Sequence, residues 1–256
     1  MRKSRRPIVS GAVSSRPVPA VIPVAPDDFH VPGGPPAFRE LGGVPLLRRA
    51  VAALATAAVV ERVVVACPRP LAAAAGDLTI PPAGATWVPV DVVPAAGPGP
   101  GHRLREVLAD LAEPAQGLVV VHDPLHPLAP AALVCEVVEA LREAPADVVA
   151  AVPVRPVTDT LKWVDADDVV RSTADRGGFR MVYSPQAHRV GPLVAALATA
   201  TDDALRGAGA DVLPRLVQDR GGRLVSVPAP SEVFRIATPE DVALAEAMLQ
   251  VGAVDA

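Results

Sequence analysis

The chain has 256 residues, of which 50% are hydrophobic and only 3% aromatic, and its formal net charge is -4. This length suffices for one large α/β domain or two small ones. The acidic balance excludes a body that covers duplex nucleic acid, and the scarcity of aromatic side chains disfavours base stacking on single strands. All apolar runs are shorter than the roughly 18 residues that a membrane span needs, so neither nucleic acid nor a membrane is expected as a partner.

The first nineteen residues differ in composition from the rest of the chain. Basic side chains stand here among serine, glycine and proline, at Arg2, Lys3, Arg5, Arg6 and Arg16. This pattern predicts a disordered basic tail over residues 1–19, without the apolar core of a secretion signal. Residues 20–256 are expected to form a single domain. Its two cysteines, Cys67 and Cys135, lie far apart in apolar segments, which is typical of reduced thiols in a cytoplasmic protein.

Valine-rich segments alternate with alanine- and leucine-rich segments of helical period over the first two thirds of the chain. The expected strands cover residues 20–24, 62–66, 87–90, 118–121 and 147–152. The expected helices cover residues 45–56, 103–111 and 131–142. Strands that alternate with helices predict an α/β fold with a doubly wound, mostly parallel sheet and right-handed crossovers.

This alternation breaks between Pro153 and Arg180. Two extended segments, residues 158–164 and 169–173, flank the acidic turn of residues 165–168, which is typical of a β-hairpin. A hairpin inserted into an α/β sheet projects from it, and a lone hairpin is marginally stable. We therefore expect a β-arm at about residues 153–178 that pairs with a second copy, making the protein a homodimer.

Regular elements resume after the arm. Strands are expected at residues 179–183, 223–227 and 233–236, and a helix at residues 192–200. Thr201 precedes two aspartates where a short helix could be capped. The last helix, from Pro239 to about Gln250, is marked by Thr238 as its N-cap and by acidic residues in its first turn.

Asp123 ends the most informative strand of the sequence. It follows three valines and His122 and precedes a proline-rich segment. Ligands of open α/β sheets bind beyond the carboxyl ends of the strands. The position therefore favours a carboxylate that holds a metal-bound phosphate, and a carboxylate that caps a turn is the simpler alternative.

Seven short motifs occur in order across residues 20–250. They are Leu41-Gly42-Gly43 with Pro45, Val121-His122-Asp123, Pro153 with Asp159-Thr160-Leu161-Lys162, Thr173 with Arg176, Ser184-Pro185-Gln186, Thr201-Asp202-Asp203-Ala204, and Ile236-Ala237-Thr238-Pro239-Glu240-Asp241 followed by Leu244-Ala245-Glu246. Together they resemble 2-C-methyl-D-erythritol 4-phosphate cytidylyltransferase, a family with a Rossmann-like nucleotidyltransferase fold. The family joins CTP to a sugar-alcohol phosphate in the non-mevalonate isoprenoid pathway. The resemblance implies attack of a phosphate oxygen on the α-phosphorus of CTP, release of pyrophosphate, and Mg²⁺ between the phosphates.

By this resemblance, the half of the site that binds the acceptor is largely retained. Thr160 and Arg176 lie on the arm and reach the acceptor held by the neighbouring subunit. Ser184 supplies a hydroxyl where the family has threonine, and Arg235 a positive charge where the family has lysine. Asp202 falls at an acidic position that lines the site, although a capping role fits it equally well. A surface charge is the alternative for the two arginines.

The same resemblance assigns the nucleotide to Ala25, Gly99, Gly101 and Arg103, and the metal to Asp123. After its first strand the family carries a glycine-rich loop with an arginine, followed by a lysine, and these groups hold the triphosphate. His30 falls near the arginine position, so His30 and Arg235 are the expected catalytic residues.

Several substitutions erode this nucleotide half. Pro26 lacks an N–H group, Asp27 and its neighbour Asp28 would repel phosphates, and Pro36 replaces the lysine. Two further changes lie downstream. Glu106 stands where the family has a hydroxyl residue that helps to hold the cytidine, and His126 replaces an arginine.

Two functions are therefore expected as alternatives. The first is a cytidylyltransferase of weakened activity, with CTP and a sugar-alcohol phosphate as substrates, because loss of one preorganised charge-stabilising donor commonly lowers a rate by about 10²–10³. The second is a catalytically inactive homodimeric relative that binds a sugar phosphate or a partner protein.

Overall fold

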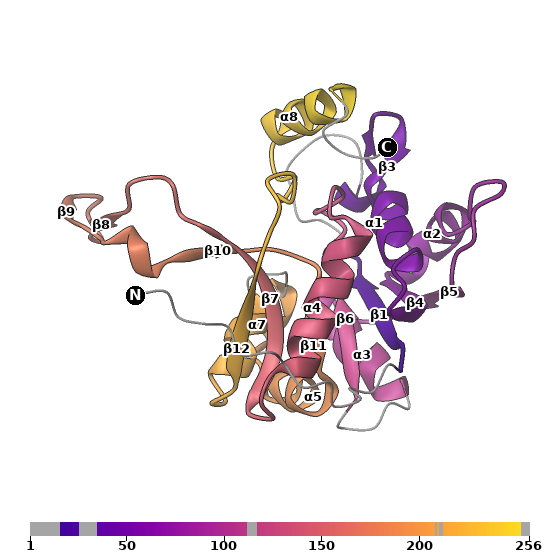
Figure 1. Cartoon of the computed structure of the whole chain (residues 1–256), viewed down its shortest axis with the longest axis horizontal. Coiled ribbons are helices and arrows are strands. Elements are labelled where there is room, and N and C mark those ends of the chain that lie inside the picture. The colour runs from indigo at the N-terminus through magenta and orange to yellow at the C-terminus, as the bar shows by residue number, and fades with distance from the viewer. Residues whose placement is uncertain (1–15, 26–34, 112–116, 208, 210–211, 252–256) are drawn as a thin grey trace, which may run out of the picture.

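A computed structural model of the chain describes residues 16–25, 35–111, 117–207, 209 and 212–251. An eight-stranded sheet forms its centre, with helices on both faces (Figure 1). The strands of this sheet are β1 (Val18–Pro23), β4 (Val60–Cys67), β5 (Val90–Pro94), β6 (Leu118–Val121), β7 (Val148–Pro156), β10 (Arg180–Val182), β11 (Gln186–Arg189) and β12 (Arg223–Pro228). Two small antiparallel pairs lie outside it, β2 (Glu40–Leu41) with β3 (Val44–Pro45), and β8 (Lys162–Val164) with β9 (Val170–Thr173).

The strands follow the order β12–β7–β11–β6–β1–β4–β5, and β10 pairs with the far end of β7 on the side where β11 lies. Parallel pairing joins β1 to β4 and β6, β4 to β5, and β7 to β12. Among the described strands of this central sheet, β10 and β11 alone run antiparallel to their neighbours. The doubly wound, mostly parallel α/β sheet expected from the sequence is thus confirmed.

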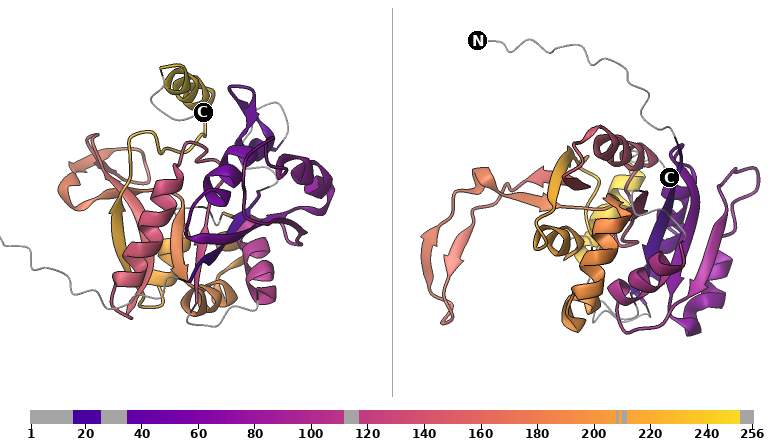
Figure 2. Two further views of the ribbon diagram at one scale, coloured as in Figure 1. Left: turned by 45° about the vertical axis from the view of Figure 1, so that its right-hand side comes forward. Right: turned by 90° about the horizontal axis from the view of Figure 1, so that it is seen from below.

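Helices cover the sheet in two layers (Figure 2). The helices are α1 (Leu46–Ala55), α2 (Ala72–Leu78), α3 (Pro100–Asp110), α4 (Ala131–Glu143), α5 (Val190–Thr199), α6 (Asp202–Arg206), α7 (Val212–Gln218) and α8 (Pro239–Gln250), with three 3-10 turns at Pro36–Phe38, Arg69–Leu71 and Arg176–Gly178. Helices α1, α2 and α4 share one hydrophobic core, and α3, α5, α6 and α7 share the other. None of the helices in the described part of the chain combines the length and the apolar character needed to cross a membrane.

Strand β1 shows why the sequence alternates as it does. Ala20 and Ile22 belong to the core on the α1 and α4 side, and Val21 belongs to the core on the α3 side. All three side chains are completely buried. A strand covered on both faces requires an unbroken apolar run, and the central strands of this sheet carry one.

Some boundaries differ from the sequence expectations. Strand β1 begins at Val18, so Val18 and Pro19 pair with β4 instead of extending the tail that we expected through residue 19. Residues 1–15 lie outside the described part. The third strand covers Val90–Pro94 instead of residues 87–90. Residues 233–236 form no strand: Val233 is completely buried within a loop, so its apolar character reflects packing and not strand pairing.

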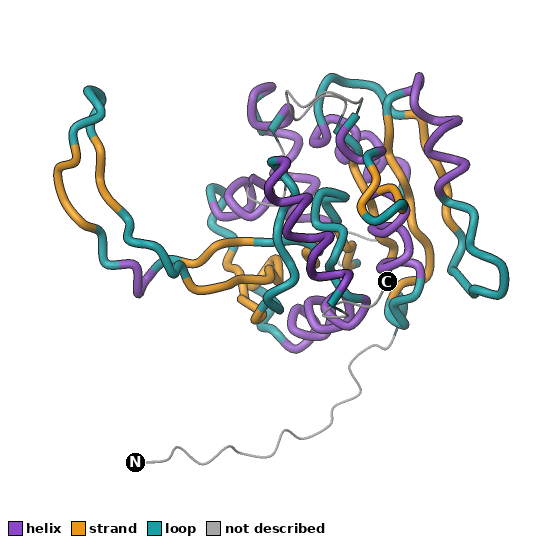
Figure 3. The backbone as a smooth tube through the Cα atoms, turned by 90° about the horizontal axis from the view of Figure 1, so that it is seen from above, coloured by secondary structure: helices purple, strands orange, loops and turns teal. Residues whose placement is uncertain are grey.

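The hairpin expected near residue 165 is present. Strands β8 and β9 pair antiparallel, with Lys162 opposite Thr173, and the arm that carries them extends away from the sheet (Figure 3). The turn closes at Asp168, whose φ is +58°. Trp163 and Val170 on the two strands are 62% and 58% exposed, so the arm leaves large apolar side chains uncovered in one protomer.

Candidate active site

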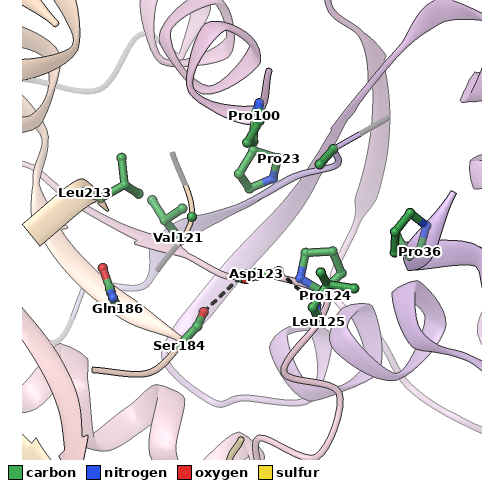
Figure 4. Close-up of a pocket in the computed structure, with 13 residues that line it drawn as sticks. Pro23, Pro36, Pro100, Val121, Asp123, Pro124, Leu125, Ser184, Gln186 and Leu213 are labelled. Atoms are coloured by element: carbon green, nitrogen blue, oxygen red, sulfur yellow. Dashed lines mark hydrogen bonds between the residues drawn. The ribbon is translucent and has the colours of Figure 1, made fainter. Parts of the chain in front are cut away.

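A pocket lies at the carboxyl ends of β1 and β6, beside the first turn of α3 (Figure 4). The empty space in and around its mouth, open solvent included, amounts to about 500 Å³. The polar side chains on its wall, among the described residues, come from Asp123, Ser184 and Gln186. Pro23, Ala25, Pro36, Ala37 and Pro100 give the opposite part of the wall an apolar surface. The pocket therefore has one polar and one apolar side.

Asp123 lies two residues after the end of β6, near the strand end that the sequence indicated, and its side chain is 12% exposed. Its Oδ1 accepts a hydrogen bond from the Leu125 N–H at 2.9 Å, and its Oδ2 accepts one from Arg235 Nε at 3.2 Å. His126 Nδ1 lies 3.6 Å from the same Oδ2. Burial alone would raise the pKa of Asp123, but His126, Arg235 and the Leu125 N–H together hold it well below its usual value. Asp123 is therefore a carboxylate.

Ser184 is held against the end of β6 from both sides. Its Oγ accepts a hydrogen bond from the Asp123 N–H at 2.8 Å (Figure 4). The same oxygen lies 2.8 Å from His122 Nδ1. His122 is 1% exposed. Burial lowers the pKa of His122 to about 3, with His126 acting in the same direction and Asp123 opposing it. His122 is therefore neutral near pH 7.

Strand β11 explains how Ser184 reaches Asp123. It inserts antiparallel between β6 and β7, with Gln186 opposite Val121. The segment just before β11 therefore lies against the end of β6. Gln186 Nε2 donates to the Tyr183 carbonyl at 2.9 Å, and Gln186 Oε1 lies 3.1 Å from His188 Nε2. These contacts hold the Gln186 side chain in the polar wall of the pocket.

The loop before α3 is held from inside by two side chains of that helix. Arg103 is completely buried, and its Nη1 donates to the carbonyls of Gly97 and Gly99 at 2.8 and 3.0 Å. Glu106 Oε2 accepts a hydrogen bond from the Ala96 N–H at 2.8 Å. Both residues therefore shape the loop beside the pocket, and Glu106 has a structural contact in place of the hydroxyl that the sequence comparison expected.

Gly99 and Asp202 lie at the junction of α3 and α6. A Cβ atom on Gly99 would lie 2.3 Å from the Cα of Arg206, so this glycine permits close packing of α6. Asp202 Oδ1 binds His102 Nε2 at 2.8 Å, and its Oδ2 accepts from Arg206 Nε at 2.8 Å. These contacts, His102 first, lower the pKa of Asp202. Asp202 is absent from the pocket wall, and the N-cap of α6 is Thr201.

The remaining expected residues lie in other places. Thr160 and Arg176 are exposed on the arm, where the Arg176 guanidinium donates to the Thr158 carbonyl. The same protomer's pocket contains neither of them among its wall residues. Gly101 is buried in the first turn of α3. His30, together with Pro26, Asp27 and Asp28, lies outside the described residues.

A divalent metal fits the donor set of this pocket only in company with a substrate. The described residues contain no cluster of three or more histidine, cysteine, aspartate or glutamate side chains that could enclose a metal. Asp123 offers one carboxylate on the pocket wall. Mg²⁺ is commonly held by one or two carboxylates together with substrate phosphates and water, so a single carboxylate suits a metal that arrives with a phosphate.

A doubly wound sheet with a carboxylate, an arginine and a hydroxyl converging at its carboxyl edge is a Rossmann-like fold with a ligand site at the place usual for such sheets. The family model described as 2-C-methyl-D-erythritol 4-phosphate cytidylyltransferase matches residues 18–251 of the chain. The chain belongs to this family. Proteins of that name from Streptomyces coelicolor and Nocardia farcinica are 36% and 38% identical to it, over 90% and 84% of this chain and 84% and 86% of theirs.

Solved structures agree with this assignment. The 2-C-methyl-D-erythritol 4-phosphate cytidylyltransferase of Thermus thermophilus superposes with a TM-score of 0.68 at 30% identity, over 91% of this chain and 99% of that one. The 4-diphosphocytidyl-2C-methyl-D-erythritol synthase of Anaerococcus prevotii has a TM-score of 0.72 at 20% identity, over 93% of this chain and all of that one. The second likeness concerns the fold alone.

Proposed function

We propose that the chain transfers the cytidylyl group of CTP to 2-C-methyl-D-erythritol 4-phosphate, releasing pyrophosphate, as a step of the non-mevalonate isoprenoid pathway. Membership of the family supports this activity. The observation that carries it in the structure is the convergence of Asp123, Arg235 and Ser184 at the end of β6. A charge-dense reaction between two phosphates needs such groups, because preorganised donors and cations stabilise the developing charge.

Each of these residues has a distinct role in the proposed reaction. The acceptor phosphate oxygen attacks the α-phosphorus of CTP in line with the departing pyrophosphate. The Arg235 guanidinium, 36% exposed beside Asp123, faces the charge that builds on the oxygens of the α-phosphorus under attack. Ser184 donates a hydrogen bond to the acceptor phosphate. Asp123 would hold Mg²⁺, which would neutralise charge shared by the phosphates.

Pro36 is expected to lower kcat/KM for CTP. It stands on the apolar wall of the pocket, where the family resemblance expects a lysine. Pro36→Lys should raise kcat/KM for CTP by at least about tenfold, since one charge-stabilising donor commonly contributes about 10²–10³. The measurement is steady-state pyrophosphate release at varied CTP. Pro36→Gln is the matched control of similar length without charge. Equal effects of the two variants would contradict an electrostatic role for this position.

We further propose that the protein acts as a homodimer through the arm. Trp163 and Val170 on the arm, and Phe179 directly after it, are between 45% and 62% exposed. Apolar side chains of this size gain stability when a second copy covers them. Pairing would also bring Thr160 and Arg176 to the partner's acceptor. Size-exclusion chromatography with light scattering at micromolar concentration should give twice the mass of the chain. A monomer at that concentration would contradict the proposed homodimer.

The activity is tested directly with pure protein, CTP, Mg²⁺ and 2-C-methyl-D-erythritol 4-phosphate. Pyrophosphate release that depends on all three, and that Asp123→Asn abolishes, is the expected result. Absence of release together with absence of CTP binding in calorimetry would leave the inactive relative that binds a sugar phosphate or a protein.

A cytoplasmic location is part of the proposal. The buried free thiol of Cys67 supports it. Burial raises the pKa of this thiol, and the nearby charge of Arg103 opposes that rise.

A further inference from the structure

The Ser184 hydroxyl has two close neighbours, and one of them can only donate. The Asp123 N–H points at Ser184 Oγ from 2.8 Å, so the oxygen accepts there. His122 Nδ1 lies at the same distance on another side. A hydroxyl has two acceptor positions and one proton. The direction of the His122 contact therefore decides where the Ser184 proton points.

The other nitrogen of His122 indicates that direction. Nε2 is buried and has no hydrogen-bond partner among the residues that the structure describes. If Nε2 carried the hydrogen, a buried N–H donor would be left unpaired, and such orphans are rare and destabilising. If Nδ1 carries it, the only unpaired group is a bare ring nitrogen. The favoured arrangement has Nδ1–H donating to Ser184 Oγ.

Two other buried histidines of this chain show the same pattern. His188 Nε2 faces Gln186 Oε1, an oxygen that only accepts, and His102 Nε2 faces Asp202 Oδ1, which also only accepts. The hydrogen of each ring therefore sits on the partnered nitrogen. The Nδ1 atom of each has no partner in the described part of the chain. His122 follows this pattern when its Nδ1 carries the hydrogen.

We propose that His122 is a positioning residue that turns the Ser184 hydroxyl proton into the pocket. With both acceptor positions of Oγ filled, by Asp123 N–H and His122 Nδ1–H, the hydroxyl can only donate. Ser184 lines the pocket and is 1% exposed, so in the proposed arrangement its proton is directed at a group that enters the pocket. The site thereby selects an oxygen without a proton, such as that of a phosphate ester. This last step depends on the proposed function, whereas the direction of the His122 hydrogen bond does not.

The hydrogen position is measurable without any substrate. Nitrogen NMR of wild-type protein labelled with ¹⁵N-histidine distinguishes a ring nitrogen that carries hydrogen from a bare one. The His122 signals are those that disappear in His122→Asn. A protonated Nδ1 with a bare Nε2 is the expected result. A bare Nδ1 with a protonated Nε2 would overturn the proposal, whether or not the protein turns over CTP.

Two variants of His122 test the consequence for binding. The asparagine amide nitrogen of His122→Asn lies near the Nδ1 position and still donates to Ser184, whereas that of His122→Gln lies near Nε2. Loss of a hydrogen bond to a charged group commonly weakens binding about 10- to 100-fold. We expect His122→Gln to raise KM for the sugar phosphate by this factor relative to His122→Asn, with a smaller change in KM for CTP.

A double variant separates positioning from packing. Ser184→Ala should raise the same KM, and adding His122→Gln to it should have little further effect, because the two residues act as one unit. Equal KM values in His122→Gln and His122→Asn, or additive effects with Ser184→Ala, would refute the positioning role. An inactive wild-type protein would instead contradict the proposed function, and the NMR result would then decide the inference alone.

Discussion

At the scale of single residues, the pKa of His188 is set by burial alone. Its side chain is fully buried, and burial lowers its pKa to about 4 from an ordinary value of 6.5. The folded protein therefore resists protonation that the unfolded chain accepts. Below about pH 6.5 the unfolded state binds more protons than the folded state. The contribution of His188 to the free energy of unfolding is therefore fully present above that pH and is lost as the pH drops toward 4. His122, with a pKa of about 3, acts in the same direction.

This linkage gives a prediction for His188→Gln. Each such histidine should remove about 1.4 kcal/mol of unfolding free energy per pH unit between roughly pH 6 and pH 4. The glutamine amide retains the donor to Gln186 Oε1 and does not titrate, so the variant should lose stability less steeply with acid. Urea unfolding at pH 7, 6 and 5 measures both slopes. Parallel curves for wild type and variant would show that His188 is not the titrating group.

The polar residues of the pocket were partly predictable. The sequence placed Asp123 and Ser184 in separate motifs and Arg235 directly before a third, and the structure brings them together. The contact between His122 and Ser184 was not predicted, because it depends on the antiparallel register of β11 against β6. A histidine next to a strand-end carboxylate carries no local signal that it binds a serine 62 residues later.

At the scale of elements, the junction of α3 and α6 depends on Gly99. A Cβ at this position would meet the backbone of Arg206 and the carbonyl of Leu205, at 2.3 and 2.7 Å. A backbone neighbour cannot rotate away as a side chain can. An added methyl group must therefore push α6 away from the loop that Arg103 holds.

Gly99→Ala should lower the free energy of unfolding by about 1–3 kcal/mol, the usual range for overpacking. It should also raise KM for CTP if the loop holds the nucleotide. Gly76→Ala is the matched control: Gly76 lies in α2, and nothing lies within 4 Å of the added Cβ. This control should gain about 0.5–1 kcal/mol from helix propensity. Urea unfolding of both variants checks the pair, and an unchanged midpoint for Gly99→Ala would contradict the close approach.

Element prediction succeeded where the apolar pattern was strong and failed where tertiary context decided. Strand β6 covers the four residues expected, because its apolar run is buried on both faces. Strand β11, with the sequence Gln-Ala-His-Arg, carries no strand pattern and exists because β6 and β7 pair with it. Helix α3 begins at Pro100 instead of residue 103, and the proline at its first position was a signal that sequence reasoning could have used.

At the scale of the whole molecule, the arm and the pocket of one protomer are separated. The arm extends away from the sheet (Figure 3), while the pocket lies at the carboxyl ends of β1 and β6. Thr160 and Arg176 therefore contribute to an acceptor site only if another protomer supplies the pocket. The proposed dimer meets this requirement, and it predicts that two defective subunits can complement each other.

Arg176→Ala and Asp123→Asn should each abolish most activity as homodimers, the first through the arm and the second through the pocket. In a mixed dimer, the pocket of the Arg176→Ala subunit meets the intact arm of the Asp123→Asn subunit. Equimolar mixing with subunit exchange should restore about one quarter of wild-type activity, since about half of the dimers are mixed and each has one intact site. Pyrophosphate release measures this recovery. Mixing Arg176→Ala with Thr160→Ala, both on the arm, is the control. In this mixture every pocket meets an arm that lacks one of the two residues, so activity should not exceed that of the two variants measured separately. Failure of the first mixture to recover, with subunit exchange verified by mass, would show that each arm does not serve its partner's pocket.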